Sequence, residues 1–336
     1  MRWRLPAAAA ALTLVSGLLA GCGGSASGNV DDKAVRKDGS VDLSKVTLRV
    51  GDQKSGAQPL LKAAGQLDHV PYKISWSEFT SGPPMLEAIN AGAVDIGGVG
   101  NAPPVFAAAA KSDIRIVYVY TAGLKGQTIE VPKDSPIKTV QQLRGKKIAV
   151  AKGSSAHYHL LSVLTKNGMT LDDVQPQYLQ PGDALAALTS GNVDAWAVWD
   201  PYSAQAEQEE GTRILVDGTG YANGFSFQVA GTDALDSKAK VAAMHDYVTR
   251  YQKAMSWANT HPKEWAKVWS QVTGMPEKAT LQAAKRRHLT PLKLDDATLA
   301  NEQKVADAFS DAKQIPGKVD MKDFVDHRFD DIAATR

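Results

Sequence analysis

Short apolar runs alternate with amphipathic stretches along most of the chain, and glycine, proline and small polar residues separate them. Compact apolar runs predict strands, whereas apolar positions three or four residues apart predict helices. Strands are expected at 48–50, 72–79, 94–99, 114–120, 147–150, 177–179 and 195–199, and helices around 85–90, 160–164 and 185–188. This alternation favours an α/β fold with largely parallel sheets.

The C-terminal third is expected to be helical, at 238–258, 262–271 and 297–312. Trp257, Trp265 and Trp269 lie in the first two of these segments. We interpret them as residues that pack the helices against a lobe, because large aromatic side chains contribute most of the buried area in such contacts. Nothing in their spacing indicates a cofactor site.

Two segments about a hundred residues apart carry nearly the same pattern. Residues 91–95 (AGAVD) lead through Val99 to Asn101, and residues 190–194 (SGNVD) lead through Val198 to Asp200. The apolar runs that begin the two units also break into small-residue loops followed by helical patterns. Two such matches at nearly one offset predict two similar α/β units. Ligands bind beyond the carboxyl ends of strands in these sheets. Each of the two units has two loops at such ends, so we expect these four loops to surround one cleft.

The first 21 residues have the pattern of a secretory signal, with Arg2 and Arg4 before an apolar run at 7–19. That run is too short to span a bilayer comfortably. It ends in Leu-Ala-Gly-Cys22, which resembles a lipobox, so Cys22 is expected to carry a lipid after cleavage. The alternative is an ordinary signal peptide with an unrelated cysteine. Residues 22–45 predict a flexible tether, and the folded body is expected from residue 46.

Composition narrows the function classes. The chain has 38 Lys and Arg against 36 Asp and Glu, and removal of the signal with Arg2 and Arg4 leaves 36 against 36, a net charge of 0. A chain without a basic excess is a poor candidate for nucleic-acid binding. Cys22 is the only cysteine, which excludes an intramolecular disulfide and a cysteine-built metal site.

Three predicted helix starts carry residues suited to an anion, because the first turn of a helix offers N–H donors and a favourable dipole. They are Ser81-Gly82 before two prolines, Asn101 before two prolines, and Ser154-Ser155 before a helical run. Each also fits a plain helix cap. We favour ligand binding for the last pair and leave the other two open.

Four further residues lie at the predicted cleft. Gln53 offers a donor and an acceptor at a strand end. His157 either donates to a ligand or packs on the helix face, and Trp199 either forms a cleft wall or packs between lobes. Asp200 either accepts hydrogen bonds from neighbouring donors or pairs with an ammonium group on the ligand.

Six motifs occur in order: VGDQK at 50–54, FTSGP at 79–83, LEAIN at 86–90, GNAPP at 100–104, KGSSAH at 152–157 and WAVWDPY at 196–202. Together they resemble the aliphatic-sulfonate-binding proteins of ABC importers, relatives of the taurine, nitrate and thiamine-precursor binders. The resemblance covers roughly 48–320. Asn101 stands where the family often has aspartate, and Asp52 where it commonly has tyrosine.

The resemblance implies an α/β periplasmic-binding-protein-like fold of type II, with two lobes joined by two crossing segments. The crossings are expected near 126–130 and 221–227. Lobe one would then comprise 46–125 plus 226–336, and lobe two 126–225.

The resemblance also implies the function. The chain would be an extracytoplasmic lipoprotein of sulfur metabolism, anchored to the membrane only through Cys22, that captures an aliphatic sulfonate and delivers it to an ABC permease and its ATPase. It would be a monomer without cofactor, metal or catalytic residues. The alternatives are a binder of taurine, nitrate or another small anion, or a sensing module. An enzyme on this fold is disfavoured because such relatives need a cysteine in the cleft. The expected ligand-binding residues are Gln53, Ser81, Gly82, Asn101, Ser154, Ser155, His157, Trp199 and Asp200.

Overall fold

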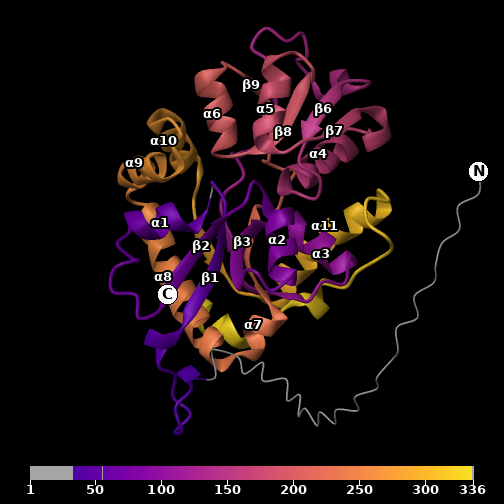
Figure 1. Ribbon diagram of the computed structural model, residues 1–336. Coiled ribbons are helices and arrows are strands. Elements are labelled where there is room, and N and C mark those ends of the chain that lie inside the picture. Colours follow the sequence, from indigo (N-terminus) through magenta and orange to yellow (C-terminus); the bar gives the residue numbers. More distant parts are fainter. Residues whose placement is uncertain (1–32, 55, 335–336) are drawn as a thin grey trace, which may run out of the picture.

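The computed structural model describes residues 33–54 and 56–334, which form two α/β lobes (Figure 1). Lobe one has a six-stranded sheet in the order β11-β4-β10-β3-β1-β2, and lobe two has a five-stranded sheet in the order β7-β6-β8-β5-β9. The expected α/β class with two lobes is therefore confirmed. The strands are β1 (Thr47–Asp52), β2 (Lys73–Glu78), β3 (Ile96–Gly100), β4 (Ile114–Thr121), β5 (Gln127–Val131), β6 (Lys147–Val150), β7 (Gln175–Tyr178), β8 (Ala195–Trp199), β9 (Arg213–Asp217), β10 (Phe225–Gly231) and β11 (Thr290–Leu292).

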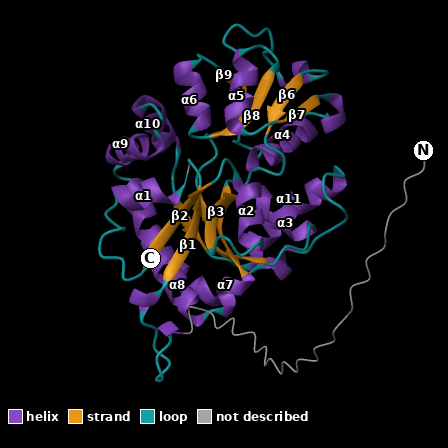
Figure 2. Ribbon diagram, in the orientation of Figure 1, coloured by secondary structure: helices purple, strands orange, loops and turns teal. Residues whose placement is uncertain are grey.

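Helices cover both faces of the sheets (Figure 2). They are α1 (Ala57–Ala63), α2 (Gly82–Asn90), α3 (Ala102–Ala109), α4 (Ser155–Lys166), α5 (Pro181–Thr189), α6 (Tyr202–Glu209), α7 (Thr232–Asp236), α8 (Lys238–Ala258), α9 (Pro262–Thr273), α10 (Glu277–Arg286), α11 (Asp296–Asp311) and α12 (Asp330–Ala334). Trp265 and Trp269 are buried, and their rings stack at 4.9 Å between centroids. The packing role predicted for these two tryptophans is confirmed.

Both sheets are mixed, which corrects the expectation of largely parallel sheets. The β1 strand is parallel to β2 and β3, and β6 is parallel to β7 and β8. In contrast, β10 is antiparallel to β3 and β4, and β5 is antiparallel to β8 and β9. Both β5 and β10 enter their sheet from the other lobe, at the edge where the parallel strands end. A strand that starts at that edge must run the opposite way.

The crossings lie a few residues away from their expected positions. Residues 122–126 connect β4 to β5, and residues 218–224 connect β9 to β10. The expected segments at 126–130 and 221–227 overlap the strands β5 and β10, whose polar residues hid them from a search for apolar runs. The predicted lobe boundaries remain a proposal, which the membership of the two sheets supports.

The duplication predicted from the sequence is visible in the topology. Both sheets place the strand that arrives from the other lobe in the same position, beside β3 in lobe one and beside β8 in lobe two. The repeated aspartates also play the same part. Asp95 accepts a 2.7 Å hydrogen bond from the Arg49 backbone N–H, and Asp194 accepts a 2.9 Å hydrogen bond from that of Lys147. Each aspartate therefore ties the loop before one strand to the adjacent strand.

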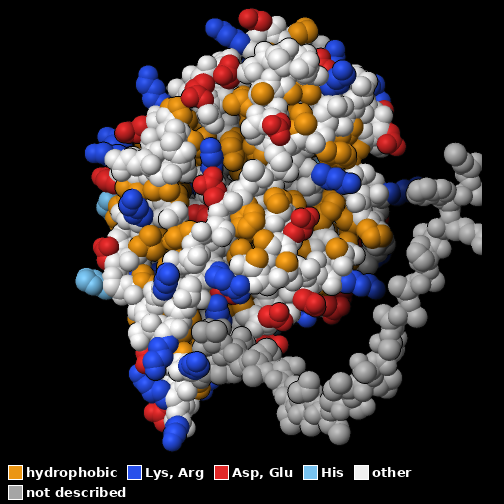
Figure 3. Space-filling model, viewed as in Figure 1, with side chains coloured by type: hydrophobic (Ala, Val, Ile, Leu, Met, Phe, Trp, Pro, Cys, Tyr) orange, Lys and Arg blue, Asp and Glu red, His pale blue; other side chains and the backbone are white. Residues whose placement is uncertain are grey.

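The described part of the expected tether packs on lobe one. Val35 forms a β-bridge with Val41, and Ala34 is fully buried. The tether prediction is therefore wrong for 33–45, where these apolar residues find a core, while Cys22 lies outside the described residues. Within 33–54 and 56–334, no helix is long and apolar enough to cross a membrane. Positive and negative side chains are interspersed over the face seen in Figure 3.

Candidate ligand-binding site

A cavity lined by both polar and apolar groups lies between the lobes, at the edge where the parallel strands of both sheets end. The cavity has a volume of about 80 Å³. Both lobes and both connections line it, through residues that include Gln53, Asn101, Ser155, Trp199, Gly126 and Ala222.

The cavity gathers most of the predicted ligand-binding residues. Those that line it are Gln53, Gly82, Asn101, Ser154, Ser155, Trp199 and Asp200, whereas Ser81 and His157 do not. The Trp199 ring meets Tyr202 edge to face at 5.8 Å between centroids and is 9% exposed. Trp199 thus forms an apolar section of a wall that also carries polar groups.

Helix α4 begins at the cavity, and its two serines differ in their hydrogen bonds. The Ser154 Oγ accepts from the His157 backbone N–H at 3.3 Å and donates to the Ala151 carbonyl at 2.7 Å, so this hydroxyl is used within the helix start. The Ser155 Oγ accepts a 2.7 Å hydrogen bond from Gln127 Nε2. With its oxygen already accepting, Ser155 has its hydroxyl proton to donate toward the cavity.

Helices α2 and α3 also begin near the cavity but offer fewer donors than α4. Each has two prolines in its first turn, at 83–84 and 103–104, and proline has no backbone N–H. The Ser81 hydroxyl is fully buried and donates to Gln180 Oε1 of lobe two at 2.8 Å. We therefore assign Ser81 to contact between the lobes.

Asn101 takes part in a chain of side-chain hydrogen bonds. Its Nδ2 donates to Asn223 Oδ1 at 2.8 Å, and Asn223 Nδ2 donates to Glu302 Oε2 at 3.2 Å. Asn223 belongs to the connection between β9 and β10. The buried Asn101 Oδ1 has no partner among the described residues, so Asn101 links the start of α3 to that connection and retains an unused acceptor.

His157 supports the loop behind the cavity. Its Nδ1 accepts a 3.2 Å hydrogen bond from the Gly153 backbone N–H, and its ring is fully buried against Phe106 and Phe309. Burial, with a smaller contribution from Lys152, lowers the pKa of His157 to about 4. The ring is therefore neutral near pH 7, and of the two roles left open for it, the geometry favours packing.

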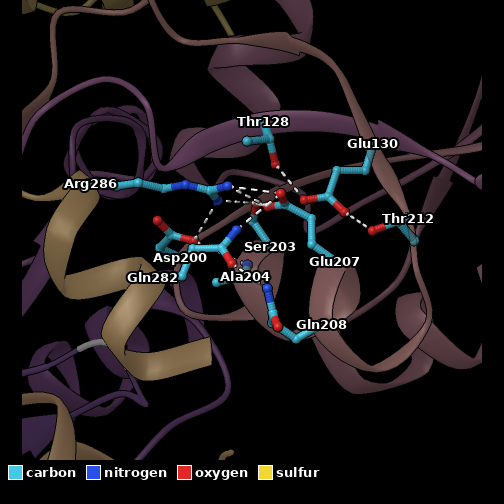
Figure 4. Close-up of polar contacts among 10 residues, drawn as sticks. All are labelled: Thr128, Glu130, Asp200, Ser203, Ala204, Glu207, Gln208, Thr212, Gln282 and Arg286. Carbon is cyan, nitrogen blue, oxygen red and sulfur yellow. Dashed lines mark hydrogen bonds and ion pairs between the residues drawn. The ribbon is translucent and has the colours of Figure 1, made fainter. Parts of the chain in front are cut away.

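Asp200 occupies the cavity wall and the edge of a polar network that joins the lobes (Figure 4). Its Oδ1 accepts from the Ala204 backbone N–H at 3.1 Å and lies 3.5 Å from Arg286 Nη1. Arg286, on α10 of lobe one, also binds Glu207 of α6 in lobe two at 2.7 Å. Burial raises the pKa of Asp200 to about 6, opposed by the charges of Arg286 and Arg287.

The polar lining residues that sequence reasoning missed include Gln127, Gln228 and Arg287. Gln228 is fully buried, and neither Nε2 nor Oε1 has a partner among the described residues. Gln228 interrupts a largely apolar strand, a signal that could have found it, whereas Gln127 begins the partly polar strand β5. Arg287 directly follows α10, in a third of the chain interpreted as packing helices.

Of the described residues that line the cavity, Arg287 and Asp200 carry charged side chains. Within the part of the chain that the structure describes, no cluster of His, Cys, Asp and Glu is placed to hold a metal ion. What the site offers is hydroxyl, amide and guanidinium donors, one carboxylate and an aromatic wall. That set suits a small anion with an organic part.

Comparison with known proteins agrees with this geometry. The model of the NMT1/THI5-like family matches residues 80–265. The alkanesulfonate-binding protein SsuA from Xanthomonas axonopodis pv. citri, solved bound to MOPS, is 34% identical with a TM-score of 0.76, over 84% of this chain and 98% of that one. The periplasmic aliphatic sulphonate binding protein SsuA from Escherichia coli is 36% identical with a TM-score of 0.71, over 84% and 92%.

The fold is also shared by an enzyme. The desulfurization enzyme DSZB has a TM-score of 0.62 at 20% identity, over 86% of this chain and 99% of that one, a likeness that extends to the fold alone. The SsuA proteins are similar over the whole body in both sequence and structure, which confirms the periplasmic-binding-protein-like fold. This chain belongs to the NMT1/THI5-like family and, within it, to the aliphatic-sulfonate-binding proteins of ABC importers.

Proposed function

We propose that this chain captures an aliphatic sulfonate in the cavity between its lobes and delivers it to an ABC permease and its ATPase. The observation that carries the proposal is the lining itself, in which donors from lobe two and Arg287 from lobe one converge on one small space. A sulfonate has three oxygens and a permanent negative charge, so it can use several donors and a cation at once. In this proposal the protein is a monomer that binds the sulfonate and catalyses no reaction.

The hydrogen-bond donors for the sulfonate head group come mainly from lobe two. Ser155 and the backbone at the start of α4 face the cavity with the positive end of the helix dipole. Gln228, whose side-chain amide has no partner among the described residues, adds an amide from lobe one. Trp199 provides the apolar surface for the alkyl chain.

Isothermal titration calorimetry of residues 23–336 tests the proposal. We expect 1-propanesulfonate to bind more tightly than butyrate, which has the same propyl chain. A carboxylate has two oxygens, and a buried donor that loses its partner costs about 1–3 kcal/mol. Sulfate and nitrate, which lack the alkyl chain, are expected to bind more weakly. Equal affinities for propanesulfonate and butyrate, or preference for nitrate, would make the chain a general anion binder.

We also propose that the protein is held at the outer face of the cytoplasmic membrane by a lipid on Cys22. The basis is the LAGC sequence at 19–22 after a signal-like segment, and the SsuA relative from Escherichia coli is periplasmic. Acyl chains contribute about 0.8 kcal/mol per buried CH₂, so they should dominate attachment. Cys22→Ser is expected to leave the fold intact and move the protein from the membrane to the soluble fraction. Retention in salt-washed membranes would exclude the anchor.

A further inference from the structure

Helix α4 of lobe two packs directly on α3 and α11 of lobe one (Figure 1). His157 of α4 lies at this contact, with its ring centroid 5.2 Å from that of Phe309 on α11 and 6.1 Å from that of Phe106 on α3. The side chain is fully buried, although it does not line the cavity. Two rings of the opposite lobe therefore supply part of the cover that separates His157 from water.

The contact between the lobes favours the neutral form of His157. Its Nδ1 accepts from the Gly153 backbone N–H, so the ring proton lies on Nε2, which is buried and has no partner among the described residues. A second proton would have to bind Nδ1, where it would face the Gly153 N–H. Burial, with a smaller contribution from Lys152, lowers the pKa of His157 to about 4 from its ordinary 6.5. An imidazolium at this position therefore destabilises the closed state.

The titratable groups around His157 do not favour its charged form. Lys152, in the loop before α4, is positive and opposes protonation. Tyr178 of β7 and Tyr158 of α4 have raised pKa values, so both are neutral near pH 7. On α11, burial raises the pKa of Glu302 well above its ordinary value, which disfavours the carboxylate, and the residues of α3 (APPVFAAA) include no titratable group. Relief of a buried imidazolium therefore requires water, which enters only when the lobes separate.

We propose that His157 is a pH-sensitive switch between the lobes: the lobes close on a sulfonate only while His157 is neutral, and its protonation opens them and releases the ligand. This inference rests on the proposed function and adds its regulation. The closed state binds the proton of His157 more weakly than the open state does. Closure is therefore fully favoured above about pH 6.5 and loses free energy as the pH falls toward 4.

Calorimetric titration with 1-propanesulfonate at pH 7.5 and 5.5 tests the switch, since a sulfonate stays ionised at both values. A pKa of 6.5 in the open state and about 4 in the closed state lowers affinity about tenfold between these pH values. Acids with a raised pKa, such as Asp200, act in the opposite direction. The measured quantity is therefore the ratio of the Kd at pH 5.5 to that at pH 7.5, which should be about tenfold larger in the wild type than in His157→Asn. Asparagine can still accept from the Gly153 N–H but cannot be protonated.

His159→Asn is the matched control. His159 lies on the same helix, is fully buried, and its pKa is also lowered by burial to about 4. Its ring meets Tyr221 of the connection between β9 and β10, and its Nε2 lies 3.0 Å from the Asp217 carbonyl of lobe two. This environment should persist when the lobes separate, so His159→Asn should keep the wild-type ratio.

Nuclear magnetic resonance of the histidine side chains gives a second readout in the wild type, where saturating 1-propanesulfonate should lower the pKa of a buried histidine. Equal ratios in the wild type and His157→Asn overturn the inference. If that variant does not fold, a wild-type spectrum in which the ligand changes no histidine pKa overturns it. In either case sulfonate binding at pH 7.5 would leave the proposed function intact. If 1-propanesulfonate does not bind the wild type at either pH, the proposed function fails and the inference fails with it.

Discussion

Arg287 is held against lobe one by an aromatic contact and reaches the cavity from there. Its Cζ lies 5.4 Å from the centroid of the Trp269 ring, and Trp269 Nε1 donates to the Lys54 carbonyl at 2.5 Å. Trp269 itself is fully buried, so the guanidinium rests on a rigid support. A positioned cation loses less freedom on binding an anion than an exposed lysine would.

We predict that Arg287→Gln weakens sulfonate binding by about 1.5–3 kcal/mol, the value of a hydrogen bond to a charged group. Lys285→Gln is the control, since Lys285 is exposed on α10, carries the same charge and does not line the cavity. Calorimetric titration with 1-propanesulfonate measures both. Equal losses of sulfonate affinity in the two variants would mean that Arg287 acts only through long-range electrostatic attraction.

Glu130 is a buried acid in the middle of β5, behind the cavity. It is fully buried and accepts hydrogen bonds from Thr128 at 3.1 Å and from Thr212. Burial raises the pKa of Glu130 to about 7. A folded-state pKa above the unfolded value means that the folded protein holds the proton more tightly. The contribution to stability is therefore present at low pH and is lost as the pH rises from about 4.5 through 7.

We predict that Glu130→Gln makes stability less dependent on pH between 5 and 8. The wild type should lose up to about 3 kcal/mol of unfolding free energy relative to the variant over this range. Urea unfolding followed by circular dichroism at several pH values measures this difference. Glu210→Gln, at an exposed position, should follow the wild type. A constant difference between wild type and Glu130→Gln would mean that Glu130 does not titrate in this range.

At the scale of elements, the start of α4 combines a structural and a binding hydroxyl in adjacent residues. We predict that Ser154→Ala lowers stability by about 1 kcal/mol, the usual cost of a lost N-cap, with a small effect on affinity. Ser155→Ala should instead weaken sulfonate binding by roughly 1.5–3 kcal/mol with little change in melting temperature. Thermal melts and titrations of both variants separate the roles. The reverse assignment of effects would contradict the hydrogen bonds described for the two serines.

Apolar strands such as β6 and β8 were predictable, whereas β9, which is also largely apolar, and the strands β5 and β10 were missed. The sequence-based bounds of β6 and β8 match the structure, because these strands are apolar runs bounded by turn residues. The strands β5 and β10 were not predicted because Gln127, Glu130 and Gln228 break their apolar patterns. Gln127 and Gln228 line the cavity, and Glu130 belongs to the buried hydrogen-bond network. Local signals report burial well, but a polar residue in a buried strand is explained only by its tertiary partners.

The residues of the candidate site were likewise predictable only where they follow a local sequence pattern. The loops at strand ends could be predicted, since each follows directly from a β–loop–helix pattern. Arg287 could not, because it reaches the cavity only through the packing of α10 on α9 in lobe one and on α6 in lobe two (Figure 1). No local pattern reports the contact between α6 and α10, whose bonded residues lie 74 to 83 positions apart.

At the scale of the whole molecule, the lobes touch on both sides of the cavity. Thr80 and Ser81 both donate to Gln180 of lobe two, at 3.0 and 2.8 Å, and on the other side Arg286 binds Asp200 and Glu207. Residues from both lobes complete the cavity only when these contacts form. A ligand that contacts both lobes favours the closed state by its differential affinity, and closure is a change that a permease can recognise.

Gly100 allows a close approach between the lobes. A Cβ at this position would lie 2.8 Å from the Ser155 Cβ, so alanine should hold the lobes apart. We predict that Gly100→Ala lowers sulfonate affinity by about 1–3 kcal/mol, the usual cost of overpacking, and reduces the decrease in radius of gyration that saturating ligand causes in small-angle scattering. Gly182→Ala, where a Cβ meets nothing within 4 Å, is the control. Full compaction of Gly100→Ala with ligand would exclude this contact as a requirement for closure.

The central claim is that the inter-lobe cavity binds the sulfonate, and a crystal structure of the complex with 1-propanesulfonate tests it most directly. The account predicts the head group at the start of α4, with an oxygen within hydrogen-bond distance of Ser155 Oγ and the Arg287 guanidinium beside it. The propyl chain should lie against Trp199, and both lobes should contact the ligand. A sulfonate bound outside this cavity, or held by one lobe without Ser155 and Arg287, would contradict the account.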